Sequence, residues 1–371
     1  MDVKKILAFV VNPIAGMGGA VGLKGTDGLY REAIERGAKP VAPRRAYRYL
    51  NTLKKLGVDV EFIAPSGEMG GIYLSKTGFR HRVVYHPRHP TTPDDTVEFI
   101  EIASDADAIV FLGGDGTARD VCRAKPDKPV IPIPSGVKMF SPCFAISPEA
   151  GAILTRDYLI GGADTQPCEV IDVDEELYRK GILELRRYCS LKAVKHPSYV
   201  QAGKQPTTKS EEELYNIAQY IIDMMDPNTF YVTGPGNTVK TIHKALGLRY
   251  TLLGFDVIKN KKLVDTDIDA ARLMRYVLRG KTKIVISPVG GSGFLLGRGN
   301  QVITPNILSK LSVTHDLIVV STRDKLLGRD CLYIDLEDPR LISKFPDTLR
   351  VVVGYKEYYV ARICKDIDGL V

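Results

Sequence analysis

Short apolar runs alternate with segments of helical periodicity along the first half of the chain. Four runs have the length of a buried strand: residues 6–11, 58–64, 109–112 and 129–134. Apolar residues at helical spacing predict a helix over residues 45–56, which ends at Gly57, and Pro93 opens another helix before the third run. Strands that alternate with helices are typical of a doubly wound, largely parallel sheet.

The second half has a similar pattern with more strand character. Helices are expected over residues 172–187, 211–225 and 239–246, strands over 230–233 and 252–258, and an exposed loop over 192–209. Strand character returns near residues 349–355. We therefore expect an α/β chain with an N-terminal doubly wound domain at residues 1–155. A β-rich second domain should occupy residues 156–371. The sequence leaves open the alternative that the C-terminal segment of this domain returns to the first domain.

Composition narrows the class of protein. The 51 Lys and Arg residues against 44 Asp and Glu give a net charge of +7, and because they are scattered we do not expect a nucleic-acid partner. Pairs such as Arg44 and Arg45 are expected on the solvated surface. His81, His86 and His89 fall in a Pro-containing stretch that suggests a surface loop.

Cysteine usage and hydropathy bear on the expected compartment. The six cysteines are widely spaced, without a C-x-x-C pair, and are expected as reduced, mostly buried thiols. The first apolar run is too short for a signal peptide, and no apolar run of 18 residues occurs. We expect a cytoplasmic protein with no membrane partner.

The strongest candidate for chemistry is the stretch from residue 107 to residue 122. It is expected to form a buried strand, a glycine turn and a helix that opens near Thr117. Gly113, Gly114 and Gly116 let a ligand approach the backbone, and the free N–H groups of the helix favour phosphate. Asp115 puts a carboxylate in this turn, which suits a base or a metal ligand in phosphoryl transfer. A simple helix cap in a tight loop is the competing interpretation.

Two further glycine turns follow predicted strands. Asn12, Pro13 and Gly16 come directly after the first strand, and Pro13 restrains the loop. The second turn lies before the helix at residues 239–246 and contains Gly234, Gly236, Asn237 and Thr238. Either turn could bind phosphate or could be ordinary turn chemistry.

The roles of two polar residues near these turns remain open. Lys138, after the fourth strand, suits a phosphate contact and a surface position equally well. Asp256 lies in an apolar run, so it either pairs with a cation, such as Lys240 or a metal, or faces solvent at a strand edge; we expect the pairing.

The Asn-Pro-x-x-Gly loop at residue 12, together with Gly-Gly-Asp-Gly-Thr at 113–117, resembles the superfamily of NAD kinases, diacylglycerol kinases and phosphofructokinases. The stretch at 230–238, which ends in Gly-Pro-Gly-Asn-Thr, is similar to the NAD kinase signature Thr-Pro-Thr-Gly-Ser-Thr, and residues 286–300 look like the family's late Ser-Pro segment. Gly-Val-Lys-Met at 136–139 resembles the ATP-NAD/AcoX kinase-type branch.

The resemblance implies a two-domain kinase that uses ATP and Mg²⁺ or another divalent cation, with NAD as the acceptor. The carboxylate that faces the acceptor hydroxyl would be Asp115, which is also the one candidate metal ligand. Glu169 would hold the acceptor, and Lys138 or Lys240 would bind its charged groups. The family's Asn before this Glu is Cys168 here, and Lys240 replaces a family aromatic residue, so the acceptor stays open. The resemblance also suggests a homo-oligomer.

Two other functions remain open from the sequence. A lipid or sugar kinase of the same superfamily shares the first two motifs, although no basic amphipathic helix suggests a lipid surface. A nucleotide-binding regulator without turnover would fit the Cys at position 168.

Overall fold

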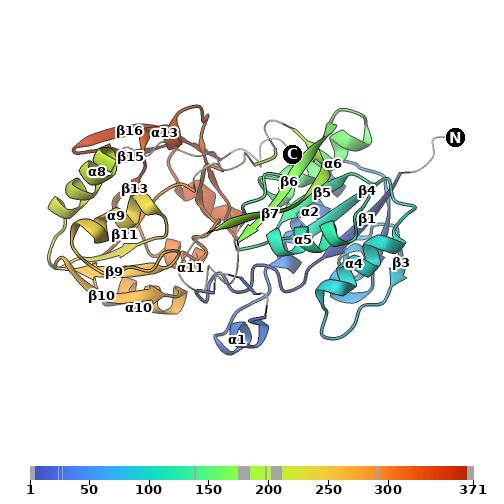
Figure 1. Ribbon diagram of the computed structural model, residues 1–371, viewed down its shortest axis with the longest axis horizontal. Helices are drawn as coiled ribbons and strands as arrows, with labels where there is room; N and C mark the ends of the chain where they lie inside the picture. The colour runs from blue at the N-terminus through green and yellow to red at the C-terminus, as the bar shows by residue number, and fades with distance from the viewer. Residues whose placement is uncertain are drawn as a thin grey trace.

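The computed structural model describes residues 5–23, 25–26, 28–137, 139–173, 184–196, 199–201, 211–289 and 292–365. Two sheets divide the described chain into two domains that lie side by side along the long axis (Figure 1). The chain is α/β, as predicted, and its second domain is built on the larger, nine-stranded sheet.

The first sheet has seven strands in the order β3-β2-β1-β4-β5-β7-β6. Its strands are β1 Ile6–Val11, β2 Glu61–Pro65, β3 His81–Tyr85, β4 Ala108–Gly113, β5 Val130–Pro134, β6 Asp164–Val173 and β7 Leu185–Lys195. Strands β1 to β5 pair in parallel, and β6 and β7 form an antiparallel hairpin. The hairpin joins the sheet through one parallel pair, Val130 with Ala193.

Helices cover both faces of this sheet because successive residues of its strands point to opposite sides. Leu7 and Phe9 of β1 pack in one cluster, with α2 Ala42–Lys55, α3 Gly71–Thr77 and α6 Pro148–Leu159. Ala8 and Val10 pack in another, with α4 Pro93–Ile102 and α5 Asp115–Arg123. This confirms the doubly wound arrangement. The short helices α1 Tyr30–Glu35 and η1 Gly67–Met69 lie in connections.

The second sheet has nine strands in the order β10-β9-β8-β11-β13-β15-β16-β14-β12. They are β8 Phe230–Thr233, β9 Phe255–Lys259, β10 Lys262–Ile268, β11 Thr282–Ile286, β12 Phe294–Leu296, β13 Leu317–Val320, β14 Leu332–Ile334, β15 Thr348–Gly354 and β16 Glu357–Cys364. Its central strands β8, β11, β13 and β15 are parallel. The helical segments are α8 Glu211–Asp223, α9 Asn237–Ala245, α10 Ala270–Arg279, α11 Pro305–Ser309, α12 Val313–Asp316, α13 Arg323–Leu326 and η2 Pro339–Lys344.

Several expectations need correction. The first sheet runs on to Lys195, so the domain boundary expected after residue 155 falls inside the first sheet's part of the chain. Both ends of the helix expected at 172–187 are strands, because the β6–β7 ladder pairs them; residues 174–183 lie outside the described chain. The loop expected at 192–209 begins as β7, and residues 202–210 are not described.

Two smaller predictions about side chains were also wrong. His81 begins strand β3 rather than lying in a loop. Arg45 is 6% exposed, not on the solvated surface, because it reaches a carboxylate of the second domain. Near the C-terminus, strand β16 pairs within the second sheet, so the described C-terminal residues do not return to the first domain.

The cysteine prediction was wrong for four of the six thiols. Cys122 of α5 is bonded to Cys189 of β7, and Cys331 is bonded to Cys364 of β16. Each pair joins elements that pack together in the fold, which spacing along the sequence does not reveal. Cys143 and Cys168 remain as free thiols. No helix in the described part of the chain is long and apolar enough to cross a membrane.

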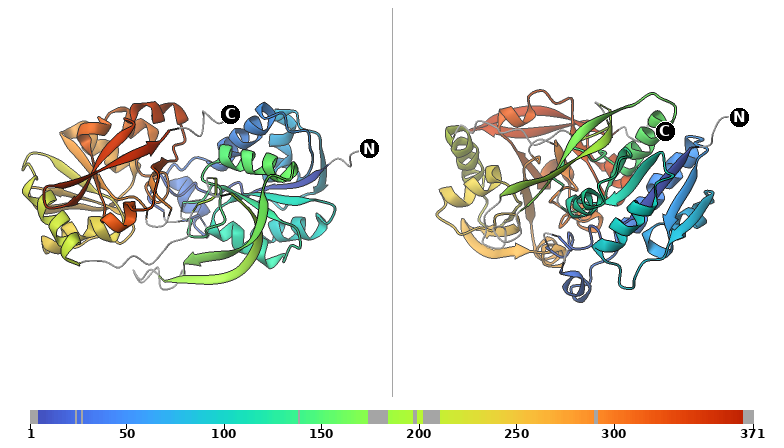
Figure 2. Two further views of the ribbon diagram at one scale, coloured as in Figure 1. Left: turned by 90° about the horizontal axis from the view of Figure 1, so that it is seen from above. Right: turned by 45° about the vertical axis from the view of Figure 1, so that its right-hand side comes forward.

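A buried ionic network joins the two domains. Arg45 of α2 donates to both carboxylate oxygens of Asp335, at 2.9 and 3.1 Å, and Arg298 donates to the same carboxylate at 3.2 Å. Arg298 also donates to the backbone oxygen of Ile146 and to Gln201 in the first domain. Two further views of the ribbon show how the two domains adjoin (Figure 2).

Candidate active site

The carboxylate of Asp115 lies at the first position of α5, where β4 ends. Gly114 precedes it in extended backbone as the N-cap, so the helix begins two residues before the expected Thr117. The carboxylate accepts hydrogen bonds from the N–H groups of Phe140 at 2.5 Å and Ser141 at 3.0 Å, and from the Ser141 hydroxyl at 2.6 Å. It is 3% exposed. The segment after β5 therefore covers the residue that the sequence marks as the main candidate.

Burial raises the pKa of Asp115 to about 7, although the hydrogen bonds from Ser141 and Phe140 act in the opposite direction. The negative charge of Asp172 on β6 adds to the rise. A carboxyl group that titrates near neutral pH can accept a proton from a hydroxyl more readily than an ordinary aspartate.

The Asn12 loop lies against the Asp115 turn. The Asn12 amide donates to the Thr117 hydroxyl at 2.9 Å, and its side-chain oxygen accepts from Ile14 N–H at 3.2 Å. Gly16 has φ +81°, and a Cβ there would lie 2.2 Å from the backbone oxygen of Ser135. Only glycine fits this approach. The structure thus brings together the first two predicted glycine turns at the carboxyl ends of neighbouring strands.

Asp172 and Ser141 belong to this cluster, although the sequence analysis did not identify them. Asp172 is 8% exposed and forms an ion pair with Arg119 of α5 at 3.2 Å. Ser141 accepts a hydrogen bond from Ile171 N–H at 3.0 Å, so it links Asp115 to strand β6. No local motif marks either residue, because the β6–β7 hairpin brings Asp172 to the site through tertiary pairing.

The third glycine turn lies in the second domain, between β8 and α9. Thr238, in the first turn of α9, accepts a hydrogen bond from the ammonium of Lys325 at 3.0 Å, and Ser287, after β11, lies 3.3 Å from the same nitrogen. Groups from the ends of three parallel strands meet there, since Lys325 follows β13. Neither Lys325 nor Ser287 was singled out from the sequence.

Lys240 is placed differently from its expected role. Its side chain is 1% exposed, and its ammonium contacts Asp256 at 2.6 Å and the backbone oxygen of Gly254 at 3.0 Å. The predicted pairing of Asp256 with Lys240 is confirmed. This buried ion pair uses the charge of Lys240 inside the second domain.

The other expected acceptor residues lie at the edge of the site or outside the described chain. Glu169 of β6 is exposed and pairs with Arg187 at 3.1 Å. Cys168, beside it, forms a hydrogen bond that, together with burial, raises the pKa of the Cys143 thiol. Lys138 lies outside the described residues.

Comparison with protein families adds the deciding observation. The family model for the ATP-NAD kinase N-terminal domain matches residues 7–162, and the model for the ATP-NAD kinase C-terminal domain matches residues 226–363. The chain belongs to the ATP-NAD kinase family. No curated protein sequence matches it.

The family's kinase chemistry fits the donor set around Asp115. Mg²⁺ is commonly held by one or two carboxylates together with substrate phosphates, and Asp115 and Asp172 supply two neighbouring carboxylates. Within the described chain no group of three or more His, Cys, Asp or Glu side chains gathers as a protein-only metal site. An ATP-NAD kinase with this site would thus need the substrate's phosphates to complete a metal's coordination.

Proposed function

We propose that this ATP-NAD kinase family member transfers a phosphoryl group from ATP to the ribose 2′-hydroxyl of NAD, which gives NADP. Membership of the family supports a phosphotransferase. The observation that carries the proposal is Asp115, whose carboxyl group is poised near neutral pH between two glycine turns.

In this proposal Asp115 accepts the proton of the acceptor hydroxyl as that oxygen attacks phosphorus. Because Asp115 is 3% exposed, the hydroxyl reaches it only after the segment at 139–141 moves aside. Asp115 can serve as a base only while it is free of metal, so its alternative role is to hold Mg²⁺ together with Asp172; the ion would neutralise charge on the transferred phosphoryl group when it is bound.

Positioning of the substrates would fall on the glycine turns. Backbone N–H groups at Gly113, Gly114, Gly116 and Thr117 would contact phosphate near Asn12. The turn at residues 234–238 would contact a second phosphate, with Lys325 as the cation beside Thr238. Glu169 and Lys138 remain proposed acceptor contacts, whereas we transfer the role expected for Lys240 to Lys325.

We further propose that the protein is cytoplasmic, where ATP and NAD are available, and that it acts as a homo-oligomer. The two disulfides are consistent with this location only in those organisms whose intracellular proteins keep disulfides. Its partners would be small molecules.

The test is an incubation of the purified chain with ATP, Mg²⁺ and NAD, with NADP read by an NADP-specific dehydrogenase. We expect NADP formation that falls at least 100-fold in Asp115→Asn, since general-base catalysis contributes about that much. Asp120→Asn is the matched control, because Asp120 lies on the same helix and faces the exposed Arg123.

Other outcomes would redirect or reject the proposal. Equal turnover in Asp115→Asn and wild type would remove Asp115 from catalysis. If ATP is bound or hydrolysed but no NADP is formed, sugars and lipids would be tested next as acceptors. Nucleotide binding without transfer to NAD, a sugar or a lipid would identify a regulator that keeps the fold.

A further inference from the structure

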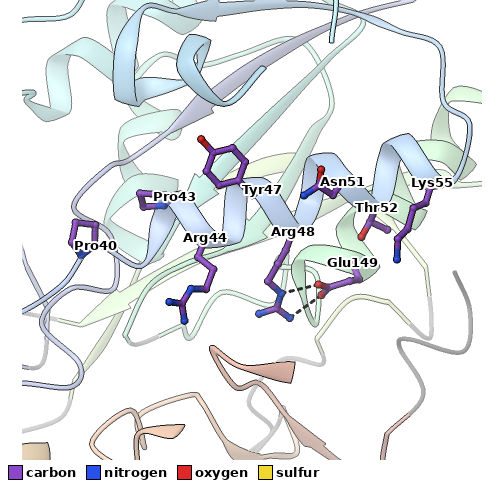
Figure 3. Close-up of a pocket in the computed structure, with 9 residues that line it drawn as sticks. All are labelled: Pro40, Pro43, Arg44, Tyr47, Arg48, Asn51, Thr52, Lys55 and Glu149. Carbon is purple, nitrogen blue, oxygen red and sulfur yellow. Dashed lines mark hydrogen bonds and ion pairs between the residues drawn. The ribbon is translucent and has the colours of Figure 1, made fainter. Parts of the chain in front are cut away.

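A groove runs along the outer face of α2, on the side of the first sheet opposite to α5. Its volume is about 740 Å³, within the range of small-molecule sites. Arg44, Tyr47, Arg48, Asn51 and Lys55 line it at spacings of three or four residues, which places them on one side of the helix (Figure 3). Glu149 of α6 completes the wall.

The middle of this α2 groove is electrically balanced. Arg48 donates to both carboxylate oxygens of Glu149, at 2.7 and 2.9 Å, and the dashed lines in Figure 3 mark this pair. Arg48 also donates to the backbone oxygen of Leu336 at 3.2 Å. Its charge is therefore neutralised by Glu149, and each of its three nitrogens already donates a hydrogen bond within the protein.

The two ends of the α2 groove are positive. Both Arg44 and Lys55 are exposed, and in the described part of the chain no carboxylate lies within ion-pair distance of either; Asp338, which is already paired with Arg340, also feels the charge of Arg44. Arg44 donates a hydrogen bond to the backbone oxygen of Glu337, at 3.4 Å. Two cations therefore face a cavity in which Glu149, the carboxylate among the described lining residues, is neutralised by Arg48.

We propose that the α2 groove binds a small molecule that carries at least two phosphate groups. Eleven residues separate Arg44 from Lys55, about 16 Å along a helix. One small anion could engage only one of them, whereas a phosphate chain lets both flexible side chains converge on it. Arg suits phosphate because its planar group donates two parallel hydrogen bonds.

The position of the groove links ligand binding to the domain interface. Arg44 and Arg48 contact the backbone at 336–337 in the second domain, and Arg45 between them holds Asp335. A ligand that draws Arg44 into the groove changes the same helix that docks the second domain. The site is separate from the Asp115 cluster, because α2 and α5 cover opposite faces of the sheet.

The test measures binding of inorganic tripolyphosphate and, separately, ATP by titration calorimetry. The variant is Arg44→Ala/Lys55→Ala, and the control is Arg31→Ala/Lys76→Ala, which removes the same charge from other exposed positions. We expect tripolyphosphate to bind at least tenfold more weakly to the variant than to wild type, and within twofold of wild type in the control. Both variants should keep the wild-type melting temperature, because all four side chains are exposed.

The two ligands distinguish the source of the phosphate. Tighter binding of tripolyphosphate identifies inorganic polyphosphate as the ligand, and tighter binding of ATP at the Arg44-dependent site identifies a nucleotide. An ATP site that survives in the variant belongs to the active site. Equal weakening in variant and control, or no binding of either ligand to wild type, would overturn the proposal. Because these titrations measure binding alone, their outcome does not depend on whether the protein transfers a phosphoryl group.

Discussion

At the scale of single residues, two features of its environment act in opposite directions on the pKa of Asp115. Three hydrogen bonds favour its ionised form, yet burial disfavours it more strongly and sets the pKa at about 7. In the unfolded chain the same group titrates near 3.8. Folding therefore favours the protonated carboxyl group, and stability must depend on pH.

We predict that the contribution of Asp115 to stability is full below pH 4 and is lost as the pH rises through about 7. A shift of this size corresponds to an upper limit on the order of 4 kcal/mol. Unfolding by urea at pH 5 and pH 8 should show wild type losing more stability than Asp115→Asn over this interval.

The comparison with Asp115→Asn removes the other groups that titrate in this range. Burial lowers the pKa of His243 to about 4, so His243 makes stability rise with pH, opposite to Asp115. Both proteins share this effect, and it cancels in the difference. Parallel pH profiles of the two proteins would show that Asp115 titrates as an ordinary aspartate.

The sequence predicted the residues at the centre of the site better than its cations. Strand, glycine turn and helix are local features, so Asp115 and the first two glycine turns could be placed together from the sequence. Whether Lys240 or Lys325 is available to bind a phosphate depends on which of the two lysines pairs with a buried carboxylate. The pairing of Lys240 with Asp256 was one of the two options that the sequence left open, but nothing local to Lys325 indicates that it reaches Thr238.

At the scale of elements, the β6–β7 hairpin brings Asp172 to the site but pairs with the sheet through a single register position. The Cys122–Cys189 disulfide ties the hairpin to α5, whose first residue is Asp115. We predict that Cys122→Ser/Cys189→Ser lowers the free energy of unfolding by about 4 kcal/mol, the loop-closure value for a separation of 67 residues. Denaturant titration of the variant and wild type measures it.

The second disulfide supplies the control for this prediction. Cys331→Ser/Cys364→Ser opens a loop of 33 residues in the other domain, so we expect a similar loss of stability with ATP binding unchanged. Thiol titration of the unfolded chain should give two free thiols before reduction and six after it. Six thiols without reductant would show that the chain is reduced as purified.

The boundaries of helices and strands were predicted well where a local sequence pattern determines them, and poorly where the pairing of strands determines them. Strands β1, β4 and β8 and helices α2, α4 and α8 follow from apolar runs, caps and periodicity. The helix predicted at residues 172–187 is wrong at both of its ends, which belong to β6 and β7. Their antiparallel ladder overrides this local preference, as tertiary pairing commonly does.

At the scale of the whole molecule, the buried carboxylate of Asp335 binds two guanidinium groups at the domain interface: Arg45 from the first domain and Arg298 from its own domain. Burial alone would raise the pKa of Asp335, but the charges of Arg45 and Arg298 outweigh it and lower that pKa to about 2. This network could not be predicted from the sequence, because its members are separated by up to 290 residues and lack a motif. A family match indicates two domains but not which side chains join them.

We predict that Asp335→Asn weakens the docking of the two domains. The side chains of Arg45 and Arg298 are 7% and 4% exposed, and Glu337 partly balances Arg45, so the uncompensated charge falls mainly on Arg298. Removing one partner of such a pair costs about 3–5 kcal/mol, because a charge then remains buried without a counter-ion.

Scanning calorimetry distinguishes weaker docking from a local effect. If the network couples the domains, Asp335→Asn should split a single unfolding transition into two, since each domain has its own core. Asp338→Asn, which removes an exposed pair with Arg340 close by, should keep one transition near the wild-type temperature. A single, equally stable transition in Asp335→Asn would mean that apolar contacts such as Phe294, which packs into the core of the first domain, hold the two domains together without the charges.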